Sequence, residues 1–119
     1  MHWILQLLFL SLLLPTDHIY QRGKASYYAQ SMNGQRTASG ERYYSDSLTA
    51  AHARLPFGTR VEVRNLKNDS IVVLRVIDRM SASSSRIIDV SWAAAKKLNF
   101  VRDGLAQVEL TIIDTIPFK

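Results

Sequence analysis

The sequence has 119 residues, of which 47% are hydrophobic and 21% are charged, and its formal net charge is +5 at pH 7. This composition excludes intrinsic disorder, and the length fits a single domain. The chain has no cysteine, which excludes disulfides, a thiol nucleophile, a zinc site with sulfur ligands and lipid attachment through an N-terminal cysteine.

The chain begins with an apolar segment. Residues 3–14 read WILQLLFLSLLL, and Pro15 ends the run. This length suits the apolar region of a signal peptide and is shorter than the roughly 20 residues that span a bilayer. We therefore expect residues 1–21 to be a signal peptide or an apolar leader, either cleaved or retained as a membrane tether. Residues 22–119 would then form a domain exported to the periplasm or cell envelope.

Three stretches of the domain predict longer strands. Apolar and polar residues alternate around Val61 and over Ala106–Ile112, a period typical of half-buried strands. Between them, Ile71–Ile77 is almost continuously aliphatic, which predicts a strand buried on both faces. The segment 67–70 (KNDS) predicts the tight hairpin that leads into it. Shorter strands are expected at Ala25–Ala29 and Arg86–Val90.

One helix is predicted after Val90. Ser91 can cap the segment 92–98 (WAAAKKL), because its hydroxyl can accept an N–H of the first turn, and Asn99 can end the helix in a left-handed conformation. A second short helical turn is expected over Leu48–Arg54. About six strands with one or two short helices predict a mainly β fold. Closure into a barrel would remove exposed strand edges.

The basic charge is concentrated in the domain, since all 15 Lys and Arg residues lie at or after Arg22. A basic surface attracts polyanions such as nucleic acid, anionic lipid or an acidic polysaccharide. The simpler interpretation is solvation, and Arg60, Arg64 and Arg75 are expected to face water. Nucleic-acid binding is supported by charge alone and conflicts with export, so no nucleic-acid partner is expected.

Three polar residues are candidates for chemistry. Asp78 ends the most apolar strand, where a carboxyl group can serve as a general acid or can simply pair with Arg79. Taken alone, Glu41 in a turn and His52 among small residues are more typical of solvated and structural positions. Asp89 is expected to stabilise the N-terminus of the helix. The sequence has no histidine cluster for a metal and no Gly-x-Ser-x-Gly motif.

These candidates lie within a series of sequence blocks. The blocks are GKASYY at 23–28, GQRTASGE at 34–41, LTAAH at 48–52, LPFGTRVEVRNL at 55–66, RVIDR at 75–79 and RIIDVS at 86–91. The series ends with AAA at 93–95 and Leu98. In content and order, this part of the chain resembles the rare lipoprotein A family, with the LPFGT and RIID blocks as the most specific matches.

The resemblance implies a six-stranded double-psi β-barrel and the activity of an endolytic peptidoglycan lytic transglycosylase. Such an enzyme cuts glycan strands, preferably those lacking stem peptides, and leaves 1,6-anhydro ends. Asp78 would protonate the glycosidic oxygen and then activate the 6-hydroxyl of the sugar, while Glu41 and His52 would line the same groove. The implied substrate-binding residues are Tyr28, Thr37 and Arg79.

The implied partners are peptidoglycan glycan strands, with cell-division or envelope proteins as further candidates, and no metal or organic cofactor is implied. The chain departs from the family pattern at two places near Asp78, and the first of them, the altered loop after Arg79, supports an alternative. The family continues after Arg79 with Gly-Pro-aromatic, whereas this chain has Met80 and a Ser-rich loop, and Ile77 stands where Asn is common. The alternative is a non-catalytic polysaccharide-binding or expansin-like wall-loosening module.

Overall fold

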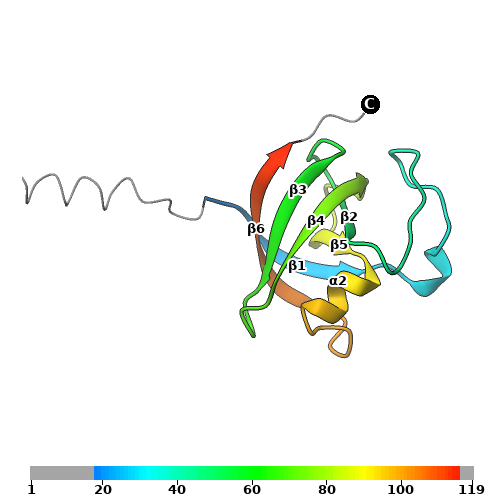
Figure 1. Ribbon diagram of the computed structural model, residues 1–119. Helices are drawn as coiled ribbons and strands as arrows, with labels where there is room; N and C mark the ends of the chain where they lie inside the picture. Colours follow the sequence, from blue (N-terminus) through cyan, green and yellow to red (C-terminus); the bar gives the residue numbers. More distant parts are fainter. Residues whose placement is uncertain (1–17, 116–119) are drawn as a thin grey trace, which may run out of the picture.

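The computed structural model describes residues 18–115, so most of the expected leader lies outside the described residues. Within that range, six strands and two short helices follow one another (Figure 1). They are β1 (Ile19–Tyr27), the 3-10 helix η1 (Gln30–Met32), β2 (Thr49–His52), β3 (Thr59–Asn65), β4 (Ile71–Asp78), β5 (Arg86–Val90), the helix α2 (Trp92–Lys97) and β6 (Ala106–Thr115). The predicted mainly β fold is confirmed. No helix in the described range is long and apolar enough to cross a membrane.

The strands form a closed barrel in the order β1-β5-β2-β4-β3-β6, and β6 pairs with β1 to complete the ring. The pairs β1/β5 and β2/β4 are parallel, whereas the other four pairs are antiparallel. This order inserts β2 between β4 and β5. Every residue of β2 is buried, and the helical turn expected over Leu48–Arg54 is therefore wrong. Pairing with two neighbours prevails over the weak local preference of this Ala-rich segment.

Two strand predictions also need correction. β4 is not buried on both faces: Ile71 and Val73 are 52% and 39% exposed, while Val72, Leu74 and Val76 belong to the core. A strand of a closed barrel has one inner and one outer face, whatever its composition. The strand expected at Ala25–Ala29 is β1, which starts at Ile19. Ile19–Gln21 therefore belong to the barrel, although the sequence places them in the leader.

The helix α2 packs onto the core through Ala94, Ala95 and Leu98, all fully buried. The hydroxyl of Ser91 accepts a hydrogen bond from the Ala94 N–H at 3.2 Å, and Asn99 has a positive φ of 57°. Both predictions about the ends of this helix are confirmed. The hairpin predicted at 67–70 is also present, between β3 and β4.

The outer face of the barrel carries ion pairs. Arg60 forms two hydrogen bonds with Asp114, and Glu109 accepts from both Arg22 and Arg64. These contacts join strands that are neighbours in the barrel. The expectation that the arginines only face water is therefore wrong for Arg60 and Arg64, and part of the basic charge is neutralised within the fold.

Candidate active site

The barrel order aligns four residues from four adjacent strands. Ser26 on β1 is in register with Asp89 on β5, Asp89 with Ala51 on β2, and Ala51 with Asp78 on β4. Strands are spaced about 4.8 Å apart, which places the backbones of Asp78 and Asp89 roughly 10 Å from each other. The small side chain of Ala51 leaves open space between two carboxylates. A groove with a cavity volume of about 270 Å³ lies here, and all four residues line it.

The carboxylate of Asp78 accepts three hydrogen bonds. Its Oδ2 accepts from the Tyr28 hydroxyl at 2.5 Å, and its Oδ1 accepts from the backbone N–H groups of Ala38 and Arg79, both at 2.9 Å. Ala38 belongs to the segment 28–48, which lies beside the barrel at the ends of β1 and β4 (cyan to green in Figure 1). The side chain is therefore fixed from three directions at the edge of the groove.

Tyr28 lines the groove, in agreement with its predicted place at the site. Its ring stacks on the buried ring of Tyr43, with centroids 4.3 Å apart and planes 13° from parallel. Burial, and then the hydrogen bond to Asp78, raise the pKa of the Tyr28 hydroxyl. The phenol therefore stays protonated at neutral pH. Since its hydroxyl is engaged with the carboxylate, Tyr28 holds Asp78 in place as well as lining the groove.

Arg79 also lines the groove. Its guanidinium lies over the ring of Phe57, 4.0 Å from the centroid, and its Nη1 donates to the carbonyl oxygen of His52 at 3.3 Å. The residue remains exposed. Asp78, Tyr28 and Arg79 are thus brought together by the fold.

Thr37 and Glu41 have other contacts. The buried Thr37 hydroxyl lies 2.7 Å from the carbonyl oxygen of Glu41 and 2.9 Å from that of Ile77, so it fastens the 28–48 segment to the residue before Asp78. The Glu41 carboxylate accepts two hydrogen bonds from Arg75, at 2.5 and 2.7 Å, and this guanidinium lowers the pKa of Glu41. Neither residue lines the Asp78 groove, and both connect the 28–48 segment to β4.

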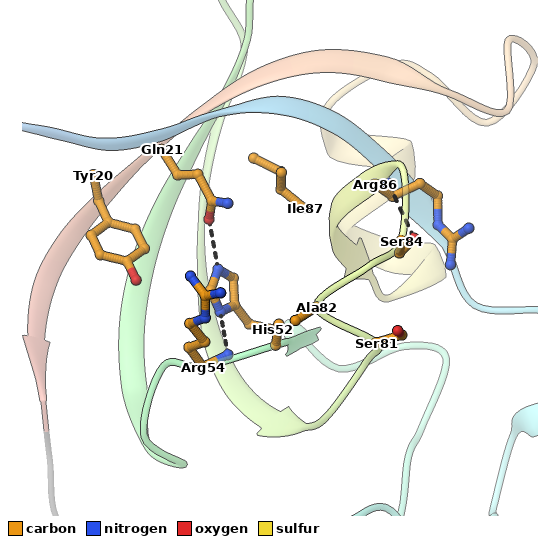
Figure 2. A pocket seen from close by; sticks show the side chains of 10 residues that line it. Tyr20, Gln21, His52, Arg54, Ser81, Ala82, Ser84, Arg86 and Ile87 are labelled. Carbon is orange, nitrogen blue, oxygen red and sulfur yellow. Dashed lines mark hydrogen bonds between the residues drawn. The ribbon is translucent and has the colours of Figure 1, made fainter.

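His52 is turned away from the groove. Its Nδ1 accepts hydrogen bonds from the N–H groups of Arg54 and Leu55, at 3.0 and 3.1 Å, and its Nε2 lies 2.8 Å from Oε1 of Gln21. Burial, and then the charges of Arg79 and Arg54, lower the pKa of the imidazole. The expectation that His52 shares a groove with Asp78 is not met, because its ring lines a separate pocket (Figure 2).

Among the residues that line the groove, the sequence analysis did not single out Ser26, Arg86 and Asp89 as site residues. Asp89 does not stabilise the helix N-terminus as expected. Its carboxylate accepts a hydrogen bond from the Ser26 hydroxyl. It also accepts two from the Arg86 guanidinium, from Nε at 2.8 Å and from Nη2 at 3.2 Å. A signal was present, because RVID at 75–78 and RIID at 86–89 place an Arg and an Asp at the same spacing. Both segments end on strands that flank β2.

The groove therefore contains groups that can transfer protons and a side chain that carries positive charge. It combines a carboxyl group with fixed donors, a second carboxylate paired with Arg86, and an exposed guanidinium. Within residues 18–115, no three His, Asp or Glu side chains gather into a possible metal site. The chemistry available from these residues is acid–base chemistry.

A family model described as lytic transglycolase matches residues 20–110 of the chain. The probable endolytic peptidoglycan transglycosylase RlpA of Aquifex aeolicus is 46% identical over 94 residues, which cover 79% of this chain and 42% of that protein. The endolytic peptidoglycan transglycosylase RlpA of Neisseria meningitidis is 48% identical over 90 residues, covering 76% of this chain and 38% of the relative. The chain thus spans about two-fifths of the length of these relatives.

Two solved structures share the fold. An expansin of Clavibacter michiganensis superposes with a TM-score of 0.63 at 17% identity, covering 82% of this chain and 52% of the expansin. The Streptomyces papain inhibitor gives a TM-score of 0.63 at 23% identity, covering 83% and 100%. Likeness at these identities concerns the fold alone. The family match spans most of the described barrel, and on that basis the chain belongs to the lytic transglycolase family, with the double-psi β-barrel that its resemblance to the rare lipoprotein A family predicts.

Proposed function

We propose that this domain is an endolytic lytic transglycosylase that cleaves peptidoglycan glycan strands and leaves 1,6-anhydro ends. The observation that carries the proposal is the placement of Asp78 in an open groove, fixed by three donors, in a chain of the lytic transglycolase family. The names of the relatives support peptidoglycan as the substrate.

In the proposed reaction, protonated Asp78 donates its proton to the glycosidic oxygen as the bond from that oxygen to C1 breaks. The sugar then carries an oxocarbenium-like positive charge. The resulting Asp78 carboxylate takes the proton of the 6-hydroxyl of the same sugar, and that oxygen bonds to C1. One carboxyl group serves both proton transfers because the nucleophile is already attached to the substrate.

Two neighbours of Asp78 suit these steps. A tyrosine hydroxyl can donate to a carboxylate and accept from a carboxylic acid, so Tyr28 can follow the change of protonation by rotating its O–H. Across Ala51, the carboxylate of Asp89 provides negative charge on the other side of the groove, where it can stabilise the developing cation. Its contact with Arg86 holds it in place.

We also propose that the domain is exported and acts in the periplasm or cell envelope, with residues 1–21 as a leader that is cleaved or kept as a tether. The apolar run at 3–14 supports this proposal. Within the envelope, cell-division or other envelope proteins are candidate partners that would bring the domain to its glycan.

The activity is tested with the full chain, Asp78→Asn and Asp103→Asn. Asp103 is an exposed acid that pairs with Lys67 outside the groove, so its variant is the matched control. Each protein is incubated with intact and amidase-stripped peptidoglycan, and the products are analysed by mass spectrometry. We expect anhydro-ended fragments from the wild-type and Asp103→Asn chains and none from Asp78→Asn.

Three other results would each have a clear meaning. Fragments that are heavier by one water would show hydrolysis between the two carboxylates instead of the anhydro reaction. Fragments that persist in Asp78→Asn would remove this residue from the chemistry. Binding to glycan without fragments from any chain would favour the non-catalytic, expansin-like module.

A further inference from the structure

A second pocket lies beside the active-site groove, and neither the family match nor the proposed reaction assigns it a role. This His52 pocket has a cavity volume of about 80 Å³, and its lining includes Gln21, His52, Arg54, Ser84 and Arg86. Figure 2 shows Gln21 of β1 hydrogen-bonded to His52 of β2, Ser84 on the Ser-rich loop, and the side chain of Arg86 directed away from His52. The volume suits a small polar group and not a whole sugar ring.

The buried histidine determines how Gln21 faces the pocket. Because Nδ1 of His52 accepts two backbone N–H groups, it carries no proton, and the neutral ring must carry its proton on Nε2. Nε2–H therefore donates to Oε1 of Gln21 at 2.8 Å. This contact fixes the orientation of the amide, so the two N–H donors of Gln21 are left for another partner.

Two further donors border the same space. The Ser84 hydroxyl accepts from the Arg86 N–H at 3.1 Å, which leaves its own proton free to donate. Arg54 lines the same pocket as His52. Within residues 18–115 no carboxylate pairs with Arg54, in contrast to Arg60, Arg64 and Arg86.

The lining of the His52 pocket contains no Asp or Glu, and of its two arginines Arg86 is paired with Asp89 in the groove, so the unpaired charge is that of Arg54. A small space with several donors and unbalanced positive charge favours an anion that accepts several hydrogen bonds. Carboxylate is such a group, and its size suits the volume. The same positive charge acts on His52. Burial is the main cause of its lowered pKa, and the charges of Arg79 and Arg54 lower that pKa further.

The pocket is placed where a ligand of the groove can reach it. Arg86 lines both hollows, and Ala51 of the groove is followed directly by His52 of the pocket. Arg79 of the groove and Ser81 of the pocket are two positions apart in the chain. The two hollows adjoin at Arg86, and the inference requires that a substituent on a sugar bound in the groove passes this residue into the pocket.

We propose that the His52 pocket binds the carboxylate of an acidic sugar of the glycan, with Arg54, Gln21 and Ser84 as its donors. The inference rests on the proposed function for the identity of the glycan. In muramic acid residues this carboxylate is on the lactyl ether, and it is free and charged only where no stem peptide is attached. The pocket would thus select glycan that has lost its peptides.

The test uses NMR titration of the full chain with N-acetylmuramic acid, its methyl ester and N-acetylglucosamine. The ester keeps the lactyl group without its charge. We expect N-acetylmuramic acid alone to shift the ring signals of His52 and the side-chain amide of Gln21. Arg54→Gln should weaken this binding about threefold to tenfold, as loss of one partly exposed charged contact does. Arg102→Gln removes an exposed arginine that lies outside the pocket, and it should leave binding unchanged.

The inference is overturned if the acid and its ester shift the same signals equally, if acetate does so as strongly, or if Arg54→Gln binds like the wild type. Should Arg54→Gln fold poorly, Ser84→Ala removes another donor and must weaken binding in the same way. The titration is repeated with Asp78→Asn, where the response must persist. Because this readout needs no cleavage, failure of the pocket is distinguished from failure of the proposed reaction.

Discussion

The hydroxyl of Tyr28 donates a hydrogen bond of 2.5 Å to Oδ2 of Asp78 and so joins the end of β1 to the end of β4. Two strands, β5 and β2, lie between them in the barrel order. The contact therefore crosses the groove and does not belong to a strand ladder. Its two residues come from sequence blocks 50 positions apart, and each orients the other only in the closed barrel.

Replacing Tyr28 with Phe tests the value of this contact. The ring can still stack on Tyr43, so we expect the fold and KM to change little. Loss of the hydroxyl frees Asp78 to rotate and removes a partner for both of its protonation states. We expect kcat to fall about tenfold to a hundredfold and the pH profile to shift. Tyr44→Phe, at an exposed ring, is the control, and wild-type kcat in Tyr28→Phe would contradict the role.

The sequence predicts secondary structure best where a local pattern is compatible with only one kind of element. The alternation around Val61 and the Ser91 cap depend on local chemistry, and both agree with the structure. The segment 49–52 has no local signal for a strand, because its small residues are chosen by close packing between β4 and β5. Outward-facing residues such as Ile71 and Val73 were expected to be buried. An aliphatic composition does not show which face of a strand will lie inside a closed barrel.

The site was predictable in part. Asp78, Tyr28 and Arg79 lie in matching blocks, and the groove contains all three. The contacts of Glu41 and His52 could not be read from spacing, because each depends on a partner far away in sequence. A motif can mark residues that shape a site without distinguishing those that line it.

Thr37 gives a second prediction. Thr37→Val removes the hydroxyl that serves the carbonyl oxygens of Glu41 and Ile77. We expect the free energy of unfolding to fall by about 1–2 kcal/mol, since a buried hydrogen bond is lost. Activity should also fall, because the 28–48 segment carries the Ala38 N–H that holds Asp78. Thr37→Ser keeps the hydroxyl and should restore both; chemical denaturation and the glycan assay provide the measurements. Equal behaviour of the Val and Ser variants would argue against a hydrogen-bonding role.

His52 predicts a pH dependence of stability. Its pKa is lowered in the folded protein, so below the unfolded value of about 6.5 the unfolded chain binds more protons. Stability should therefore be constant above that pH and should decrease as the pH falls toward the folded pKa, by at most about 1.4 kcal/mol per pH unit. The lowered pKa of Glu41 places its titration below this window.

Urea denaturation between pH 5 and pH 7.5 measures this slope. In His52→Asn the side-chain oxygen can still accept the N–H groups of Arg54 and Leu55, as in an Asx turn. This variant should be less stable at every pH and should lose the slope between pH 5 and pH 6.5. A slope that survives the substitution would assign the titration to another group.

The pair of Glu41 and Arg75 gives the last prediction. Both side chains are 38% exposed, so the coupling between them should be only about 0.5–1 kcal/mol. Because the folded pKa of Glu41 is lowered, this contribution is present above about pH 4.5 and is lost as the pH falls through the folded value. Denaturation of Glu41→Gln, Arg75→Gln and the double variant measures it.

The same cycle separates a positioning role from a catalytic one. If Glu41 acts by holding the 28–48 segment against β4, each single variant and the double variant should lower kcat by the same small factor. If instead its carboxylate meets the substrate, Glu41→Gln alone would lose far more activity than Arg75→Gln. The groove lining leaves Glu41 out, and Ala38, Thr37 and Glu41 share one short segment whose position sets the third donor to Asp78. We therefore expect equal, non-additive losses.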